Sequence, residues 1–303
     1  MSGKSHILMK SIGWFRQGKN IVETARPYIG QGISQQDIVE IAYDLQAGSY
    51  TKALEDPKMR SDKQAWGERI ARILLELGVN SVCEAGVGEA STLAFVAKAL
   101  EGRMSVSGFD ISLSRLLHGR AFLARSGVGA RLFCADILQV PLPDSAVDVV
   151  LTNHSIEPNG GAEAPILQEL LRVCARYLVM VEPDYERASR AQQERMIKHN
   201  YVRKIRGHLE KLPGRLIRDE AWPIFSNPLN KASLFVFEKS GAAPAPPQFD
   251  FVSPVNKKPL TSVENFLFCP DEGLLYPVAF GIPVLRDASA IVCTQADRFR
   301  DMP

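Results

Sequence analysis

The sequence is poor in cysteine and has no long hydrophobic run near its start. Its five cysteines are an odd number without a C-x-x-C spacing, and three of them lie in apolar stretches. This pattern disfavours a disulfide framework and indicates buried free thiols in a reducing compartment. The apolar pair Trp14 and Phe15 is followed at once by Arg16-Gln17-Gly18-Lys19, so we expect no signal peptide or membrane span there. We therefore predict a cytoplasmic protein with no membrane partner.

An excess of charge of either sign is also missing. The formal net charge is +2, with 23% charged and 46% hydrophobic residues, which is ordinary for a globular protein. Such a balance does not indicate a nucleic-acid partner, although it does not exclude one. The 303 residues suffice for one large domain and one small domain.

Helical patterns fill residues 1–77. Apolar residues recur at helical spacing after Ser34, at Ile38, Ile41, Ala42 and Leu45. A second apolar pattern over residues 66–77 predicts a helix that ends at Gly78. We expect this region to form a lid over a pocket or an oligomerisation surface, through which the chain would form a homo-oligomer.

Residues 78–239 alternate between strand and helix patterns. Apolar strands are predicted at 79–85, 104–109, 130–134, 146–152 and 177–181, with helices at 91–100, 113–125 and 164–175. Strands alternating with helices of this length form a parallel sheet that is covered by helices on both faces. We therefore predict an α/β, Rossmann-like domain. A long helix over about residues 186–211 and two apolar segments, 221–225 and 232–237, complete it.

The end of the chain differs in composition. Residues 240–248 combine small residues with three prolines, which predicts a linker because such a segment cannot form a packed element. Residues 249–303 follow it and predict a small, separate β-rich domain.

Ligands of parallel sheets bind beyond the carboxyl ends of the strands, and unusual residues stand there in this sequence. Glu84, Gly86 and Gly88 lie at the end of the first predicted strand and precede a helix. Glycines permit a tight turn and the close approach of a ligand to the backbone. A carboxylate at Glu84 suits a cationic sulfonium and amino group, whereas a dinucleotide site must accept a pyrophosphate anion and requires no such acid.

Two more carboxylates follow the second and third strands. Asp110 lies 22 residues after Gly88 and is placed to accept both hydroxyls of a ribose, a contact that NAD enzymes also use. Asp136 is placed to accept an adenine amino group between apolar walls at Ile111 and Ile137, and its alternative role is to cap an ordinary turn. A nucleoside cofactor is therefore expected, with a nicotinamide dehydrogenase as an alternative that rests on Asp110.

These motifs resemble the class I S-adenosylmethionine-dependent methyltransferases over residues of about 79–238. The matching segments are VCEAGVGEAST, GFDIS, CADILQVPLPDSAVDVVLTNHSIE and LRVCARYLVMVEP. The resemblance implies S-adenosyl-L-methionine as cofactor and a seven-stranded sheet whose last strand is antiparallel. It also implies cofactor contacts from Glu84, Gly86, Gly88, Asp110, Asp136 and the loop from Asn153. To these we add the flanking residues Ala85, Ile111, Ala135 and Ile137.

The C-terminal segment resembles the small zinc-binding domain that activates certain tRNA and translation-factor methyltransferases as a separate subunit. The similarity lies in Tyr276-Pro277-Val278 and Gly281-Ile282-Pro283-Val284-Leu285. Ser253 and Asn256 stand where that family has its first cysteine pair, and Cys269 alone fits a later ligand position. A structural zinc needs four nitrogen or sulfur ligands, so we predict a metal-free version of this domain fused in cis, and no metal site.

Polar residues that follow the fourth and fifth strands are candidates for the chemistry. In the loop 153–161, His154 is predicted as a general base, and Glu157 is predicted to orient either the acceptor or His154. Alternatively, His154 packs over the adenosine or solvates the loop. Glu182 and Tyr185 are predicted to contact the substrate, and the alternative role of this segment is to cap a helix through Asp184. His199 is a further catalytic candidate, on a predicted helix within a segment that holds ten Lys or Arg against two Glu between residues 187 and 218. That imbalance makes an anionic acceptor such as a phosphorylated sugar a candidate.

We therefore predict a methyltransferase that transfers a methyl group to a small-molecule or sugar-like acceptor at oxygen. An RNA or protein acceptor is the alternative, supported by the activator-like domain and the basic segment. The absence of an Asn-Pro-Pro-Tyr type motif after the fourth strand weighs against methylation of nitrogen. A non-catalytic scaffold that binds the cofactor is the second alternative.

Overall fold

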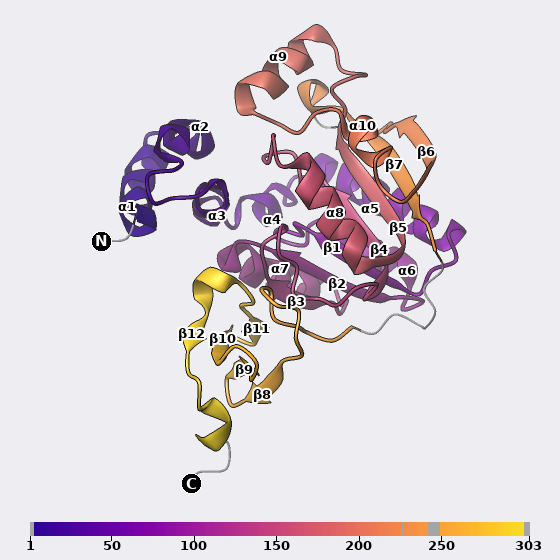
Figure 1. The fold of residues 1–303 in the computed structure, drawn as a ribbon. Helices are drawn as coiled ribbons and strands as arrows, with labels where there is room; N and C mark the ends of the chain where they lie inside the picture. Colours follow the sequence, from indigo (N-terminus) through magenta and orange to yellow (C-terminus); the bar gives the residue numbers. More distant parts are fainter. Residues whose placement is uncertain (1–2, 226, 242–248, 300–303) are drawn as a thin grey trace.

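The computed structural model describes residues 3–225, 227–241 and 249–299, so the predicted linker lies almost wholly outside the described residues. Its centre is a seven-stranded sheet with the order β3-β2-β1-β4-β5-β7-β6 (Figure 1). Strand β7 pairs antiparallel with both of its neighbours, and all the other pairs are parallel. The predicted α/β, Rossmann-like fold with one reversed strand is confirmed. The strands are β1 (Ser81–Ala85), β2 (Ser105–Asp110), β3 (Arg131–Cys134), β4 (Val147–Asn153), β5 (Cys174–Pro183), β6 (Gly214–Ala221) and β7 (Ala232–Lys239).

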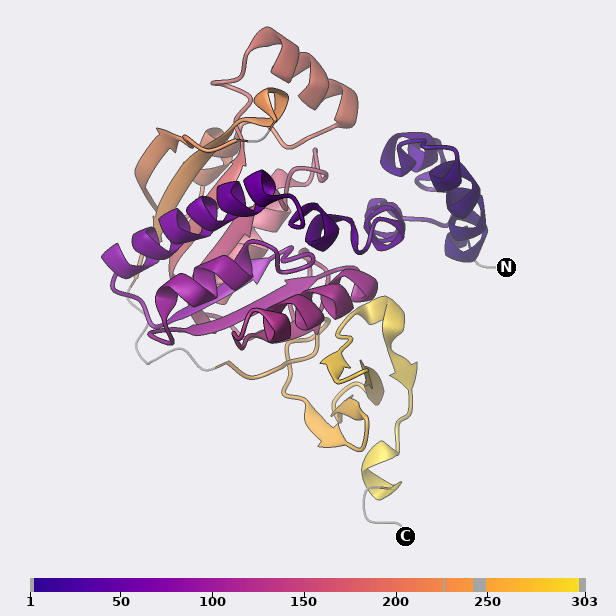
Figure 2. The same cartoon turned by 180° about the vertical axis from the view of Figure 1, so that it is seen from behind.

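Helices cover both faces of this sheet because its central strands are apolar on both sides. Neighbouring residues Val82 and Cys83 of β1 are both fully buried, and they belong to different core clusters. One face packs against α5 (Pro57–Glu76) and α6 (Leu93–Leu100), with α7 (Leu113–Arg125) beside them (Figure 2). The other face packs against α8 (Glu163–Val173) and α10 (Ile205–Leu209). Cys83, Cys134, Cys174 and Cys269 are buried and free, as predicted.

The N-terminal region is helical, as predicted. It contains α1 (Gly3–Arg16), α2 (Ile21–Ala25), the 3-10 turn η1 (Arg26–Tyr28), α3 (Gln35–Leu45) and α4 (Ser49–Ala53) before α5. Ser34 caps α3 in a reciprocal box with Asp37. At the other end of α3, Asp44 accepts hydrogen bonds from the hydroxyls of Ser112 (2.7 Å) and Ser114 (3.0 Å) at the start of α7. The region is thereby fixed beside the carboxyl end of β2.

The predicted long helix over residues 186–211 is wrong. The structure has α9 (Arg190–His199), then an irregular segment, then α10. Asn200 ends α9 in the left-handed conformation (φ 54°). The segment that follows bonds to the loop after β4, because Gly160 N donates to Asn200 O and Val202 N donates to Glu157 O. These tertiary hydrogen bonds outweigh the helical preference of the local sequence. The apolar segment 221–225 begins with Ala221, the last residue of β6, and continues beyond that strand.

The C-terminal segment forms a small antiparallel sheet of β8 (Thr261–Val263), β9 (Phe266–Cys269), β10 (Leu274–Ala279), β11 (Ile282–Pro283) and β12 (Ile291–Val292). It joins the edge of the large sheet beside β3 (Figure 1), where Leu285 N donates to Cys134 O at 2.8 Å. Arg286, directly after this contact, forms an ion pair with Glu40 of α3 at 2.6 Å. The C-terminal sheet therefore contacts both the large sheet and the N-terminal region.

Candidate functional site

One cavity of about 290 Å³ opens at the carboxyl ends of the central strands, and it brings most of the predicted site residues together. Nine of the ten predicted cofactor contacts line it, and Ala85 lies buried in β1 instead. His154 and Glu157 line the same cavity. Glu182, Tyr185 and His199 are not among its lining residues. The nine are Glu84, Gly86, Gly88, Asp110, Ile111, Ala135, Asp136, Ile137 and Asn153.

The turn after β1 requires glycine at two positions. Gly86 and Gly88 have φ angles of +71° and +56°, a region that favours glycine. At Gly86 space imposes the same choice, since a Cβ there would lie 2.4 Å from Ser155 Cβ, whereas the neighbour at Gly88 is the end of the flexible Arg115 side chain. The turn is pinned to β2 by a hydrogen bond from Val87 N to Phe109 O at 2.8 Å.

Asp110 ends β2 with its carboxylate buried and oriented by two amides. Its Oδ2 accepts from Gly88 N and its Oδ1 from Ser112 N, both at 2.9 Å. A carboxylate has about four lone-pair sites, so acceptor capacity remains for the hydroxyls of a ribose.

Asp136 follows β3 and lines the cavity. Its Oδ1 accepts a hydrogen bond from Leu138 N at 2.9 Å, which is the contact expected if Asp136 caps a turn. Burial raises the pKa of Asp136, and the positive charge of Arg286 opposes that shift. Asp136 therefore combines a local turn with a position beside the predicted adenine pocket.

Glu84 is buried next to a lysine that the sequence reasoning missed. Burial raises the pKa of Glu84 to about 8, and the charge of Lys63 opposes the shift. Its Oε2 has no hydrogen-bond partner among the described residues. Lys63 of α5 lines the cavity and donates to Thr92 Oγ1 at 3.0 Å. An unpaired buried carboxylate oxygen fits a cationic ligand group, and the lysine fits an anionic one, as the amino and carboxylate groups of S-adenosylmethionine require.

His154 and Glu157 form a hydrogen-bonded pair, as predicted. His154 Nδ1 lies 3.0 Å from Glu157 Oε2, and the amide nitrogen of Asn230 lies 3.4 Å from the same oxygen. The imidazole packs against Trp66, with the ring centroids 5.7 Å apart. The Asn230 amide nitrogen also lies 3.2 Å from Nδ1, so the tautomer depends on which neighbour pairs with Nδ1, and pairing with Glu157 leaves Nε2 as a proton acceptor.

Glu182 lies behind this loop rather than in the cavity. It is fully buried, and its Oε1 accepts from Ser155 N at 3.0 Å and Ile156 N at 3.4 Å. Burial raises the pKa of Glu182 to about 7, an effect that the charge of His154 opposes. Glu182 therefore positions the loop that carries His154.

Tyr185 and His199 have partners away from the cavity. The Tyr185 ring lies beneath Arg203, and His199 Nδ1 lies 3.0 Å from Glu23 Oε1 of α2. Burial lowers the pKa of His199, with the charge of Arg195 acting in the same direction. The nearby Asp184 does not cap α9, because Ser189 does.

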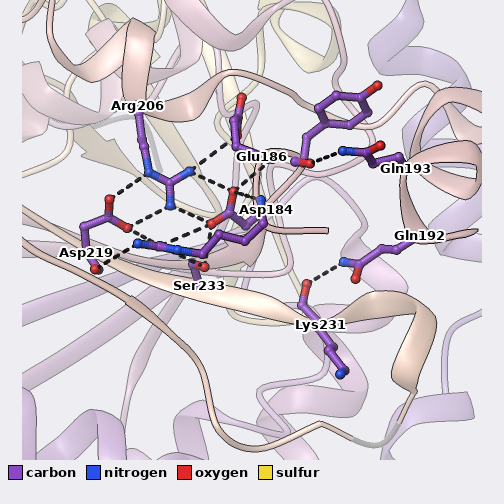
Figure 3. A network of polar contacts seen from close by, with 10 residues as sticks. Asp184, Glu186, Gln192, Gln193, Arg206, Asp219, Lys231 and Ser233 are labelled. Atoms are coloured by element: carbon purple, nitrogen blue, oxygen red, sulfur yellow. Dashed lines mark hydrogen bonds and ion pairs between the residues drawn. The ribbon is translucent and has the colours of Figure 1, made fainter. Parts of the chain in front are cut away.

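The basic segment carries less free charge than its composition suggests. Arg206 lies between Asp184 and Asp219 (Figure 3), with hydrogen bonds of 2.6 Å and 2.7 Å. Arg187 also pairs with Asp219, and Arg190 pairs with Glu194. Burial would raise the pKa of Asp184, but the hydrogen bonds from Arg206 and Ser233 lower it well below its usual range. The arginines of this network bind protein carboxylates, so they do not support the predicted phosphate site.

The N-terminal region supplies a wall of the cavity through residues that the sequence analysis did not single out. Tyr43, Tyr50 and Trp66 line it from α3, α4 and α5. Glu89, which follows Gly88 directly, accepts from Gly48 N (3.0 Å), Tyr50 N (3.2 Å) and Thr51 N (2.7 Å) at the start of α4. The acid directly after the second glycine was the available signal for this contact.

No helix in the described ranges is both long and apolar enough to cross a membrane. Within those ranges, no three His, Cys, Asp or Glu side chains come together in a metal-binding group.

Comparison with known proteins agrees with this geometry. Residues 82–178 match the family described as "Methyltransferase domain". The magnesium protoporphyrin IX methyltransferase of Synechocystis PCC 6803, solved with bound S-adenosylmethionine, is similar with a TM-score of 0.53 and 15% identity over 70% of this chain and 100% of that one. A protein assigned as a sarcosine dimethylglycine methyltransferase from Galdieria sulphuraria gives a TM-score of 0.51 and 13% identity over 61% of this chain and 89% of that one. No curated protein matches the chain.

The solved structures agree in fold, and the family match lies on the segment that carries the glycine turn, Asp110, Asp136 and His154. The central part of this chain, over residues 82–178, therefore carries a methyltransferase domain.

Proposed function

We propose that this methyltransferase acts on an oxygen atom of a small-molecule or sugar-like acceptor, with His154 as the general base. The observation that carries the proposal is the His154–Glu157 pair, which lines the same cavity as Glu84 and Asp110. A base is needed only where the accepting atom carries a proton, as a hydroxyl does.

S-adenosylmethionine, when bound, supplies an electrophilic methyl group on a sulfonium. His154 Nε2 takes the proton of the acceptor hydroxyl while the acceptor oxygen forms its bond to the methyl carbon. The carbon–sulfur bond of S-adenosylmethionine would break as the methyl group is transferred, and its electron pair would stay on sulfur in a neutral thioether. Glu157 holds the imidazole in orientation and stabilises the imidazolium that forms. The rest of the rate enhancement comes from alignment of the acceptor inside the cavity.

The cofactor contacts proposed here are the predicted residues, with one addition. Asp110 would bind the ribose, and Asp136 would bind the adenine between Ile111 and Ile137. Glu84 and Asn153 would face the amino-acid part, and Lys63 would pair with its carboxylate. The backbone of Ala85, Gly86, Gly88 and Ala135 would complete the pocket.

A small acceptor fits the enclosure better than RNA or protein does. The cavity is walled by Tyr43, Tyr50 and Trp66 of the N-terminal region, which we propose is a lid spanning residues 1–77. Five of the ten cations in the basic segment that supported a nucleic-acid acceptor form ion pairs with acids, namely Arg187, Arg190, Arg206, Arg215 and Arg218. The base geometry at His154 favours an enzyme over a scaffold that only binds the cofactor.

We further propose that residues 249–303 are a metal-free domain beside the catalytic domain of residues 78–239. Ser253, Asn256, Cys269 and Glu272 have the spacing of two C-x-x-C pairs. Ser253 Oγ donates to Glu272 Oε2 at 2.7 Å, Asn256 N to Glu272 Oε1 at 3.2 Å, and the Tyr276 hydroxyl to Glu272 Oε2 at 3.2 Å. Hydrogen bonds to one carboxylate would thus join the two turns in place of a metal.

The test is transfer of a labelled methyl group from S-adenosylmethionine to a panel of sugars, phenols, hydroxy acids, nucleotides and tRNA. With the accepting compound found, His154→Ala should lower kcat by about 10²–10⁴-fold, the usual contribution of a general base, and leave the affinity for S-adenosylhomocysteine unchanged. His6→Ala, at an exposed position of α1, is the matched control. Full turnover by His154→Ala, or transfer to tRNA alone, would show that the proposal is wrong.

A further inference from the structure

Arg115 is buried, and no described residue accepts a hydrogen bond from its guanidinium. It stands in the first turn of α7, is 9% exposed and lines the cavity. Its guanidinium forms no hydrogen bond or ion pair with any described residue, and its Nε is buried without a partner. Burial of a charged group is unfavourable unless the group is paired, so a buried arginine that faces a cavity indicates a ligand acceptor atom.

Aromatic rings pack against this guanidinium but do not provide the hydrogen-bond acceptors that its N–H groups need. Arg115 Cζ lies 5.0 Å from the centre of the Tyr43 ring and 4.6 Å from that of Tyr50. Ring faces stabilise a cation, but they leave its five N–H donors in need of acceptors. Both rings belong to the N-terminal region, so that region and α7 together shape the place where an anion would bind.

The cofactor carries one anionic group, and another residue is better placed for it. Glu84 and Lys63 are close enough for Lys63 to lower the pKa of Glu84. The amino and carboxylate groups of the cofactor share one carbon atom, so a carboxylate at Lys63 lies beside an amino group at Glu84. This arrangement leaves Arg115 for the acceptor.

The charge of the cavity limits what the acceptor carries. Lys63 and Arg115 are the lysine and arginine among its described lining residues, which also include the acids Asp62, Glu84, Glu89, Asp110, Asp136 and Glu157. One free guanidinium amid several acids balances one negative charge rather than the two of a phosphate monoester. The planar fork of an arginine also matches the two oxygens of a carboxylate.

We propose that Arg115 binds a carboxylate of the acceptor, so that the substrate is a hydroxy acid or phenolic acid with a single negative charge. This inference rests on the proposed methylation of a small acceptor at oxygen. Arg115 would fix one end of the acceptor while its hydroxyl faces His154.

The test measures binding and needs no methyl transfer, so it fails or succeeds independently of the role of His154. The protein, saturated with S-adenosylhomocysteine, is titrated by calorimetry with 4-hydroxybenzoate, 4-hydroxyphenylacetate and 3-hydroxybutyrate, each against its methyl ester, and with phenyl phosphate. At least one acid should bind about tenfold more tightly than its ester, the value of one charge-assisted hydrogen bond pair. Arg115→Gln should remove this preference, and Arg115→Lys should keep part of it.

A second pair of titrations separates the acceptor from the cofactor. Lys63→Met should weaken the binding of S-adenosylhomocysteine but not that of 5′-methylthioadenosine, which lacks the amino-acid part. Arg115→Gln should weaken the binding of neither compound. If Arg115→Gln weakens the binding of S-adenosylhomocysteine but not that of 5′-methylthioadenosine, Arg115 binds the cofactor and the inference is overturned. It is also overturned if no acid is preferred to its ester by the wild type, if Arg115→Gln retains the preference, or if phenyl phosphate binds more tightly than every acid.

Discussion

Removal of the Glu89 carboxylate should open the N-terminal wall of the cavity. Glu89 is 1% exposed, and it accepts hydrogen bonds from three backbone amides and from the Thr51 hydroxyl. Helix α4 has only five residues, and its N-cap Gly48 provides no side chain, so Glu89 caps the helix from another part of the chain. A carboxylate there also interacts favourably with the helix dipole.

The size of the effect follows from these contacts. In Glu89→Ala several buried donors lose their acceptor at once, so we expect a cost near the upper end of the range for an unsatisfied buried group, about 3 kcal/mol. That cost should appear as local opening of α4, a helix of only five residues. An opening equilibrium that shifts by about 3 kcal/mol changes by roughly 100-fold.

Amide hydrogen exchange measures this opening directly. The amides of Gly48, Tyr50 and Thr51 should exchange roughly 100-fold faster in Glu89→Ala, with Glu89→Gln intermediate because it keeps one acceptor oxygen. Glu68→Ala, at an exposed position of α5, is the control and should leave these amides unchanged. Unchanged protection of the three amides in Glu89→Ala would refute the argument that this carboxylate holds the wall.

Two further predictions concern buried carboxylates. The pKa of Glu182 rises from 4.5 to about 7 on folding, so the folded state keeps a proton that the unfolded state loses, and the free energy of unfolding should fall as the pH rises through this interval. Glu182→Gln should lose that part of the pH dependence in denaturant titrations; parallel curves for the two proteins would contradict the shift. Glu272→Ala should destabilise the C-terminal domain by about 1–3 kcal/mol, as the loss of a partner for buried polar groups does, while elemental analysis of the wild type finds no zinc. One equivalent of bound zinc would disprove the metal-free domain.

The sheet and the residues proposed to bind the cofactor at its carboxyl edge were predictable because their sequence signals are local. The buried strand before Glu84, the two glycines and the spacing to Asp110 all lie in short segments of sequence, and the parallel fold brings strand ends together without further information. The same holds for His154 and Glu157, which are three residues apart.

The acceptor side of the cavity was not predictable in this way. Tyr43, Tyr50 and Arg115 meet only through the packing of the N-terminal region on α7, which no local pattern encodes. The long helix was predicted wrongly for the same reason, since the break at Asn200 depends on hydrogen bonds to the loop after β4. Strand β6 escaped prediction because it is an edge strand rich in charged residues, such as Arg215 and Arg218, and lacks an apolar run.

The most direct test of the account is a calorimetric titration of the protein with S-adenosylmethionine and, separately, with NAD. We predict that S-adenosylmethionine binds one site per chain and that NAD does not compete for it. Asp110→Ala should make the binding free energy of S-adenosylmethionine less favourable by about 1.5–3 kcal/mol for each hydrogen bond lost to the ribose. Tighter binding of NAD, or an unchanged affinity in Asp110→Ala, would contradict the assignment of this cavity.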